Sequence, residues 1–574
     1  MAETIVSPGV FQRENDISFI TPAPLEAGAA ILGPTVKGPV EIPTVVTSYN
    51  DFVRKFGDTF ESGSDKHEFF TSMAVKSYFS QGGNSCLVTR VVSGTYSRAT
   101  NSAITATDGG SAPFTIETLG KGTIYNNSTA SSDPGTQNSD GSLVSGSVDN
   151  VRWEISNIST TKGTFSLSVR RGDDSNKNKV VLETFNNLSL DPNSENYISK
   201  VIGDQILNKQ TDSSGTVYIE TTGSYANSSN YIRVAGVTRN TLNYLGNDGS
   251  IRLGSLSGSL PTAQSGSFYG ATGTIAGGAN LYGDISTQTQ GVAAANYTDA
   301  ITILENKEEY LFNVISAPGI TNDLHGATVD SLVSLVETRG DAIAVVDLKG
   351  YGATVSTTVT QANDLNSSYA AAYWPWLQTQ SATGKNVWAP ASVFIPGVYA
   401  FTDGAAAPWF APAGLVRGGI PGVIQAERKL SRSDRDTLYD NKVNPIATFP
   451  GTGIAVFGQK TLQNKASALD RVNVRRLLID LKKFIGDQAQ NLVFEQNTIT
   501  TRNKFLAVVN PYLDSVVQRQ GLYTYRVVMD DSNNTADVID RNQLVGQIYI
   551  QPAKTAEFII LDFVIEPTGA TFGG

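Results

Sequence analysis

The sequence predicts a multidomain protein that combines an α/β core with an α+β domain in its last third. Two observations indicate the core: a helix stopped by glycines and followed by a strand within residues 69–92, and a strand–helix–strand succession within residues 310–347. Such successions with short connections are typical of parallel sheets. A third observation is the Ser-, Thr-, Gly- and Asn-rich stretch 94–295 between them, which indicates one or two β-rich insertions.

Length and composition limit the classes of protein that need to be considered. The 574 residues are too many for one core, and 40% apolar with 17% charged residues fits a folded chain. No apolar run approaches the roughly 20 residues of a membrane span, and residues 1–5 lack the basic start of a secretory signal. The lone Cys86 excludes an intrachain disulfide framework and favours folding in a reducing compartment.

Charge is distributed unevenly along a chain whose net charge is −10. Residues 425–526 contain sixteen Lys and Arg against nine Asp and Glu, so the rest of the chain is strongly acidic. A nucleic-acid binder usually has a strongly basic domain, and we therefore expect no nucleic-acid partner. One basic face that meets an acidic protein partner remains compatible with this distribution.

The first part of the chain reads as an arm followed by α/β elements. Pro8-Gly9 and the prolines at 22 and 24 prevent a helix near the start, so residues 1–22 are expected to form an extended arm. A strand is expected at 27–32, a short helix around Phe52 to Phe56, a longer helix at 69–79 and a strand at 86–92. The expected division is an arm at 1–22, core at 23–93, insertion at 94–295, core at 296–436 and a C-terminal domain at 437–574.

The insertion and the second part of the core have different patterns. Alternating apolar and polar residues at 152–155 and 165–169 predict half-exposed strands, and the polar stretch 126–150 predicts a loop. After the insertion we expect a strand at 310–316 closed by Pro318-Gly319, a helix at about 328–338 and a strand at 341–347.

The last third contains two predicted helices and three predicted strands. Residues 469–485 place their apolar side chains within about 120° of a helical wheel, and Arg471, Arg475 and Lys482 fall together beside that stripe. A helix at 501–519 should kink at Pro511, and strands are expected at 522–529, 544–550 and 557–565.

The apolar run 558–565, broken only by Asp562, requires neighbours. A continuous apolar run indicates a strand covered on both faces, and each buried side chain contributes about 1.5–3 kcal/mol. The strands expected at 522–529 and 544–550 can supply this cover within the chain. Another subunit can supply it as well, and both arrangements can coexist if the local strands are the platform to which a neighbour adds an edge.

No catalytic or metal-binding constellation is found. His67 and His325 do not accompany a Gly-x-Ser-x-Gly sequence, and two histidines with one cysteine are too few for a metal site. The Gly-Lys pairs at 120–121 and 384–385 lack the other residues of a phosphate loop. Gly451-Thr-Gly453 lacks the third glycine of a dinucleotide fingerprint, the 530–534 stretch lacks the glycine and glutamate of a calcium loop, and Arg171-Gly-Asp173 is short enough to arise by chance. We therefore expect no cofactor and no enzymatic activity.

Several motifs closely resemble the contractile tail sheath proteins of myophages. The main block contains Tyr369-Ala-Ala-Ala-Tyr-Trp-Pro-Trp376, Ile395-Pro-Gly-Val-Tyr-Ala-Phe-Thr-Asp403, Trp409-Phe-Ala-Pro-Ala-Gly414 and Arg417-Gly418. Supporting stretches are 43–57, 82–91, Leu438 to Pro445, Gly458 to Leu462, Asn473-Val-Arg-Arg476 and Phe494-Glu-Gln-Asn497. The resemblance covers about the first 93 residues and the chain from Tyr310 onward, whereas the middle region matches nothing.

The resemblance implies a subtilisin-like core without protease residues, and six-subunit rings stacked helically around a tube that contraction drives through the host envelope. It implies that arms link subunits, which assigns that role to Ile5, Val6, Val10, Phe558, Ile560, Phe563 and Ile565. Arg471, Arg475 and Lys482 become candidates for facing the tube. The implied partners are further copies of the chain, the tube protein, and baseplate and terminator proteins, in a virion tail assembled in the host cytoplasm. A phage-derived particle such as an R-type bacteriocin shares this mechanism, and an α/β hydrolase is the remote alternative.

Overall fold

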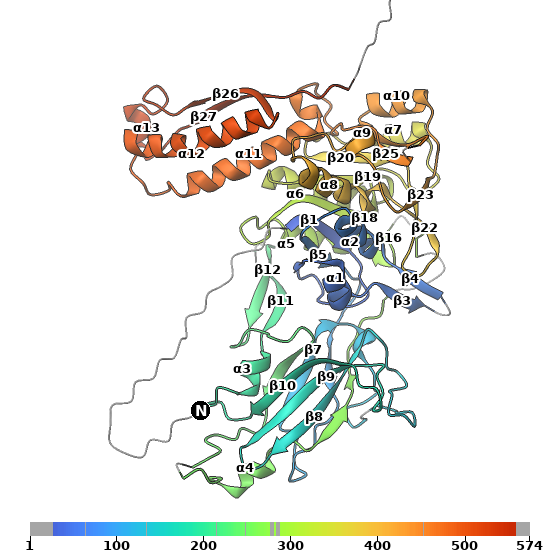
Figure 1. The fold of residues 1–574 in the computed structure, drawn as a ribbon, viewed down its shortest axis with the longest axis vertical. Helices are drawn as coiled ribbons and strands as arrows, with labels where there is room; N and C mark the ends of the chain where they lie inside the picture. The colour runs from blue at the N-terminus through green and yellow to red at the C-terminus, as the bar shows by residue number, and fades with distance from the viewer. Residues whose placement is uncertain are drawn as a thin grey trace, which may run out of the picture.

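The computed structural model describes residues 27–557, apart from 63–64, 134, 214, 247, 276–280, 283–286 and 452. A β-rich part lies at one end of the long axis of the molecule (Figure 1). At the other end, an α/β layer lies beside a pair of long helices with a two-stranded ribbon. The coarse prediction of a multidomain α/β protein is confirmed.

An eight-stranded sheet forms the middle layer, with strand order β2-β5-β1-β18-β19-β20-β24-β25. The strands are β1 (Ala27–Gly33), β2 (Thr44–Val46), β5 (Cys86–Arg90), β18 (Phe312–Thr321), β19 (Ile343–Asp347), β20 (Ala370–Trp374), β24 (Val443–Phe449) and β25 (Gly453–Val456). The six inner strands pair in parallel, and β2 and β25 are antiparallel edges. The sheet therefore continues past residue 436, where the sequence had suggested that the core ends.

Helices cover both faces of this sheet, which explains why its inner strands are mostly apolar. In β19, Ile343 and Val345 enter the apolar cluster beneath α1, α2 and α8, whereas Ala344 and Val346 enter the cluster beneath α5, α6 and α10. The helices are α1 (Tyr49–Phe56), α2 (Phe70–Ser80), α5 (Tyr297–Ile303), α6 (Asn322–Arg339), α7 (Val355–Asn363), α8 (Ile395–Ala405), α9 (Gly414–Arg417) and α10 (Arg432–Asp440). A parallel sheet buried on both faces follows from this arrangement.

Two boundaries in this layer differ from the prediction. Strand β18 does not end at Pro318-Gly319 but continues to Thr321, because a register shift against β19 accommodates the pair and Gly319 adopts a φ of +93°. Helix α6 starts at Asn322, well before the predicted residue 328. Its first turn is irregular at His325, whose Nδ1 accepts a hydrogen bond from the Thr321 amide at 3.1 Å. The residues of α6 before 328, which lack the apolar periodicity of a helix, include this distorted turn, and the prediction therefore missed them.

Two four-stranded antiparallel sheets make up the insertion. One has the order β13-β7-β6-β15 and the other β10-β9-β8-β14. Their strands are β6 (Arg98–Asn101), β7 (Phe114–Lys121), β8 (Val151–Ser159), β9 (Thr164–Arg171), β10 (Val181–Ser189), β13 (Ile232–Val237), β14 (Gln264–Gly266) and β15 (Phe268–Tyr269). The sheets share one apolar cluster in which the rings of Phe114 and Phe165 stack at 5.5 Å. Short helices α3 (Ile198–Ile202) and α4 (Gly254–Gly258) flank them.

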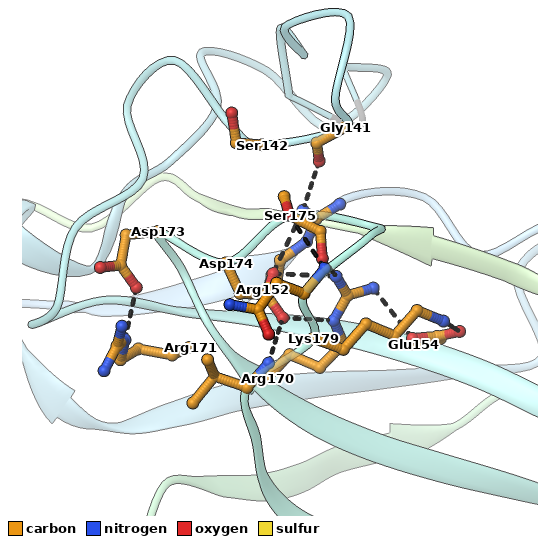
Figure 2. A network of polar contacts seen from close by, with 12 residues as sticks. Gly141, Ser142, Arg152, Glu154, Arg170, Arg171, Asp173, Asp174, Ser175 and Lys179 are labelled. Carbon is orange, nitrogen blue, oxygen red and sulfur yellow. Dashed lines mark hydrogen bonds and ion pairs between the residues drawn. The ribbon is translucent and has the colours of Figure 1, made fainter.

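A buried ionic network lies in the insertion around Arg170 (Figure 2). Arg170 donates from Nε and Nη2 to both carboxylate oxygens of Asp174, at 2.7 and 2.9 Å, and from Nη1 to Glu154 at 2.9 Å. Arg152 donates to the carbonyl of Gly141 at 2.8 Å and so fixes the loop 126–150, whose described residues contain no helix or strand. Arg171 pairs with Asp173 at 2.5 Å, so the two charged residues of the Arg-Gly-Asp sequence neutralise each other.

Several contacts attach the insertion to the core. The fully buried Arg90 donates to the carbonyls of Gly38 and Lys121, both at 2.8 Å. The hairpin of β11 (Ile206–Thr211) and β12 (Val217–Thr222) extends to α5 (Figure 1), where Lys209 pairs with Glu41 and Asp299. The strands β16 (Gln288–Thr289) and β17 (Val292–Ala293) already pack on the core, so the α/β layer resumes before residue 296.

The last third consists of two long helices and a ribbon. Helices α11 (Val472–Gln490) and α12 (Ile499–Gln518) pack together with β26 (Leu522–Val528) and β27 (Gln547–Pro552) around a separate apolar cluster. Helix α12 continues on both sides of Pro511. The remaining elements are β3 (Thr59–Ser62), β4 (Asp65–Glu68), β21 (Leu377–Gln380), β22 (Asn386–Ala389), β23 (Val423–Ala426) and α13 (Ala536–Asp540).

Candidate assembly site in the last third of the chain

A cluster of polar side chains holds the end of the described chain against the core. Arg471, which precedes α11, donates from Nε and Nη2 to the two carboxylate oxygens of Glu557, at 2.8 and 3.0 Å. Gln459 donates from Nε2 to Thr555 Oγ1 at 2.6 Å and to Glu557 at 3.0 Å. The ring of Tyr439 lies 5.8 Å from the Arg471 guanidinium. We call Tyr439, Gln459, Arg471, Thr555 and Glu557 the exit clamp, because the apolar segment 558–565 follows directly.

Electrostatics favour the charged form of this clamp. Burial alone would raise the pKa of the Glu557 carboxyl, but the hydrogen bonds from Arg471 and Gln459 outweigh burial and leave its pKa below the usual value. Arg471 also pairs with Asp470 at 2.9 Å. The bidentate guanidinium–carboxylate geometry is the strong form of such pairs. The position from which the C-terminal segment leaves the core is therefore fixed by three residues far apart in the sequence.

The three basic residues predicted on one helix face do not form one exposed group. Arg475 is only 4% exposed, lies 3.9 Å from the centre of the Tyr369 ring and contacts Ser368 Oγ. Lys482 is exposed and donates to Tyr369 Oη at 3.2 Å. The structure thus brings Arg475 and Lys482 together over one tyrosine and places Arg471 in the exit clamp.

A fourth arginine, Arg476, joins α11 to the α/β layer. It is 3% exposed, donates to both carboxylate oxygens of Asp403 in α8 at 2.7 and 2.5 Å, and lies 4.6 Å from the centre of the Tyr399 ring. The sequence contains both residues in the motifs quoted above, but nothing in the spacing indicates that they pair. This role, like that of Gln459 and Glu557, was not predicted.

The ribbon β26–β27 is a two-stranded antiparallel sheet that packs through β26 on α12. Within the described part of the chain, neither of its two outer edges pairs with a further strand. The two strands expected at 522–529 and 544–550 are therefore present and pair with each other. The residues predicted to link subunits, Ile5, Val6, Val10, Phe558, Ile560, Phe563 and Ile565, all lie outside the described residues.

The histidines and one buried aspartate of the core contact other parts of the protein. His67 lies against Phe60, and the buried His325 uses Nδ1 to cap the start of α6. Burial raises the pKa of the Asp347 carboxyl at the end of β19 to about 7, although hydrogen bonds from the Ser392 hydroxyl (2.5 Å) and amide (3.2 Å) oppose that shift. Over the described ranges, no group of three His, Cys, Asp or Glu residues could hold a metal ion. No helix there is long and apolar enough to cross a membrane.

Comparison with known families decides the relationship of the chain. Residues 290–462 match the model of the phage tail sheath protein central domain, and residues 464–566 match that of the phage tail sheath C-terminal domain. The chain contains two domains of the phage tail sheath family. Both the α/β layer after the insertion and the exit clamp with its helices therefore lie within the matched sheath domains.

Relatives agree with this assignment, and a solved structure shares the fold. The chain is 40% identical to the tail sheath protein of Vibrio phage KVP40 over 244 residues. This match covers 42% of this chain and 36% of the relative. It is 41% identical to the tail sheath protein of Enterobacteria phage T4 over 187 residues, and this match covers 33% of this chain and 28% of the relative. The matches span about a third of these relatives. The crystal structure of a sheath tail protein from Listeria innocua has a similar fold, with a TM-score of 0.52 and 12% identity over 92% of this chain and 95% of that one.

Proposed function

We propose that the protein is the structural subunit of a contractile tail sheath. Its copies would form six-subunit rings stacked around a tail tube, and contraction of the stack would drive the tube through the host envelope. The observation that carries this proposal is the ribbon β26–β27, which has two unpaired edges within the described chain and lies beside the exit clamp. Strand addition to such an edge uses backbone hydrogen bonds that persist while domains rotate.

The linking elements are the arm around Ile5, Val6 and Val10 and the segment containing Phe558, Ile560, Phe563 and Ile565. A linked subunit requires a segment that leaves its own domain at a fixed point, and the bidentate contact of Arg471 with Glu557 provides that point. The remaining tube-facing candidate with an exposed charge is Lys482. Further partners would be the tube protein and the baseplate and terminator proteins, in a virion tail assembled in the host cytoplasm.

The proposal includes a subtilisin-like core that performs no catalysis. The parallel order of six strands with helices on both faces supports a relation to such α/β folds, and the use of His325 as a backbone cap disfavours the alternative of an α/β hydrolase. A phage-derived particle such as an R-type bacteriocin would use the same subunit in the same way, and neighbouring capsid genes would distinguish the two.

Electron microscopy of the purified protein tests the proposal. The unmodified chain should form rings or tubes in negative stain. Replacing Ile5 and Val6 with proline removes two backbone donors and should leave the melting temperature unchanged while abolishing tubes. The matched control is the double alanine variant at the same positions, which keeps both donors and should still polymerise. Long tubes formed by the double proline variant would contradict the linking role of the arm.

A further inference from the structure

A cavity of about 560 Å³ lies where the insertion meets the core. Its core wall includes Lys37, Asn50 and Arg54, and its insertion wall is formed by β7, by Leu207 of β11 and by the loop 227–231. The volume falls within the range of small-molecule sites, and such sites occur preferentially between domains. Nothing in the sheath role described above uses this cavity.

The charged side chains around the cavity are unevenly matched. Five Lys or Arg residues line it against two carboxylates, Asp58 and Asp149, in a chain whose net charge is −10. Most of these cations already have acidic partners: Lys37 pairs with Asp149 at 3.0 Å, Arg54 and Lys55 pair with Asp51, and Arg171 pairs with Asp173 (Figure 2). The remaining cation is Arg98.

Arg98 lacks a carboxylate partner among the described residues. Its Nη2 reaches only the carbonyl of Leu207, at 3.4 Å, and its buried Nε has no hydrogen-bond partner. Its cross-strand partner in the β6–β7 pair is Lys121, which likewise forms no ion pair within the described chain. Like charges directly opposite each other on neighbouring strands are destabilising. Burial and the neighbouring charge of Arg98 both lower the pKa of Lys121.

Neutral groups that can bind hydroxyls line the same cavity. Asn227 lines the cavity with a buried Oδ1 that has no hydrogen-bond partner in the described part, while its Nδ2 donates to the Gln205 carbonyl at 2.7 Å. Tyr125 and Tyr231 contribute aromatic rings. A buried unpaired donor on a cation and a buried unpaired acceptor on an amide both cost free energy unless a ligand or water completes them.

We propose that this interdomain cavity binds a small polyhydroxylated oxyanion, with Arg98 as its charge-pairing residue and Asn227 as a hydroxyl acceptor. The oxyanion can be a phosphate monoester or a carboxylate of a sugar, since both present oxygens to a guanidinium in the same geometry. Because the cavity has walls from both domains, the bound ligand would also tie the insertion to the core.

Calorimetric titration of the full-length protein tests the site, with glucose 6-phosphate, glucuronate and glucose as probes. At least one of the two anionic sugars should bind with a Kd below about 1 mM and raise the melting temperature, and the stronger of the two identifies the anion source. Glucose should bind at least tenfold more weakly than that anion. Binding of neither anion at about ten times that concentration, or equal binding of glucose, would overturn the proposal.

Variants separate the site from general charge effects. Arg98→Gln should raise the Kd of the bound anion at least tenfold, whereas Arg252→Gln, which removes an exposed charge elsewhere on the insertion, should leave it unchanged. If Arg98→Gln fails to fold, Leu207→Trp serves instead, because it fills the cavity from the β11 side, next to Arg98, and should abolish binding. Unchanged affinity in the folded variant would refute the assignment.

Discussion

Replacing Arg471 with glutamine is expected to release the C-terminal segment from the core without unfolding the protein. The two hydrogen bonds to Glu557, at 2.8 and 3.0 Å, are charge-assisted, and bonds to charged groups contribute about 1.5–3 kcal/mol. The Glu557 side chain is 18% exposed, so water replaces part of what is lost, and the lower half of that range, about 1.5–2 kcal/mol, applies. This free energy raises the population with an open clamp about 10- to 30-fold.

Cleavage by endoproteinase Lys-C after Lys554 measures this opening, because the bond lies beside Thr555 of the exit clamp. When opening and closing are fast, the cleavage rate follows the open population, so release of residues 555–574 should accelerate about 10- to 30-fold. Intact-mass spectrometry detects the product. Lys482→Gln is the control, since it removes a positive charge from the same helix and leaves the clamp in place. Equal cleavage rates in the two variants would refute the reasoning.

Three other outcomes are expected. Hydrogen bonds hold the folded pKa of Glu557 below its unfolded value of about 4.5, so the clamp should be fully formed above that pH and weaken as the pH falls below it. Pepsin replaces Lys-C as the protease for this measurement. The variant Glu557→Gln should remove the pH dependence of cleavage. Arg476→Leu leaves Asp403 without its partner and should cost about 3 kcal/mol in chemical denaturation, whereas leucine at both positions should recover most of that loss; no recovery would contradict a paired role. Deleting residues 98–271 with a short linker should leave a folded core that polymerises, because Ser97 and Thr272 already lie together with a backbone hydrogen bond of 3.2 Å. Extending the deletion to residue 295 also removes β17, which packs on the core, and should lower the melting temperature markedly.

Local patterns predicted much of the fold because their physical cause is local. The apolar residues 342–346 indicated a strand, and β19 spans Ile343–Asp347 with both of its faces covered. The apolar stripe of 469–485 indicated a helix, and α11 spans 472–490. The alternating runs at 152–155 and 165–169 lie in the paired strands β8 and β9. In each case the periodicity of a few residues reports which side chains meet the core.

Contacts between distant residues could not be predicted in this way. Arg471 lies on the charged side of a helical wheel, and only the return of the chain 86 residues later supplies Glu557 as its partner. Arg475 is charged yet buried because the ring of Tyr369 covers it, which no helical wheel can indicate. The length of β18 depends on a register shift against β19, which is likewise a property of the pair of strands.

Helix α11 has a mechanical consequence, because a single uninterrupted helix belongs to two apolar clusters. Val472 and Ile479 pack in the cluster of the α/β layer, whereas Leu477 and Leu481 pack with α12 and the ribbon. With 19 residues it is about 28 Å long. A force applied to the ribbon therefore reaches the eight-stranded sheet through a stiff rod that is fastened to α8 by Arg476. In the proposed sheath, the α/β layer and the last third would therefore rotate together as one rigid body.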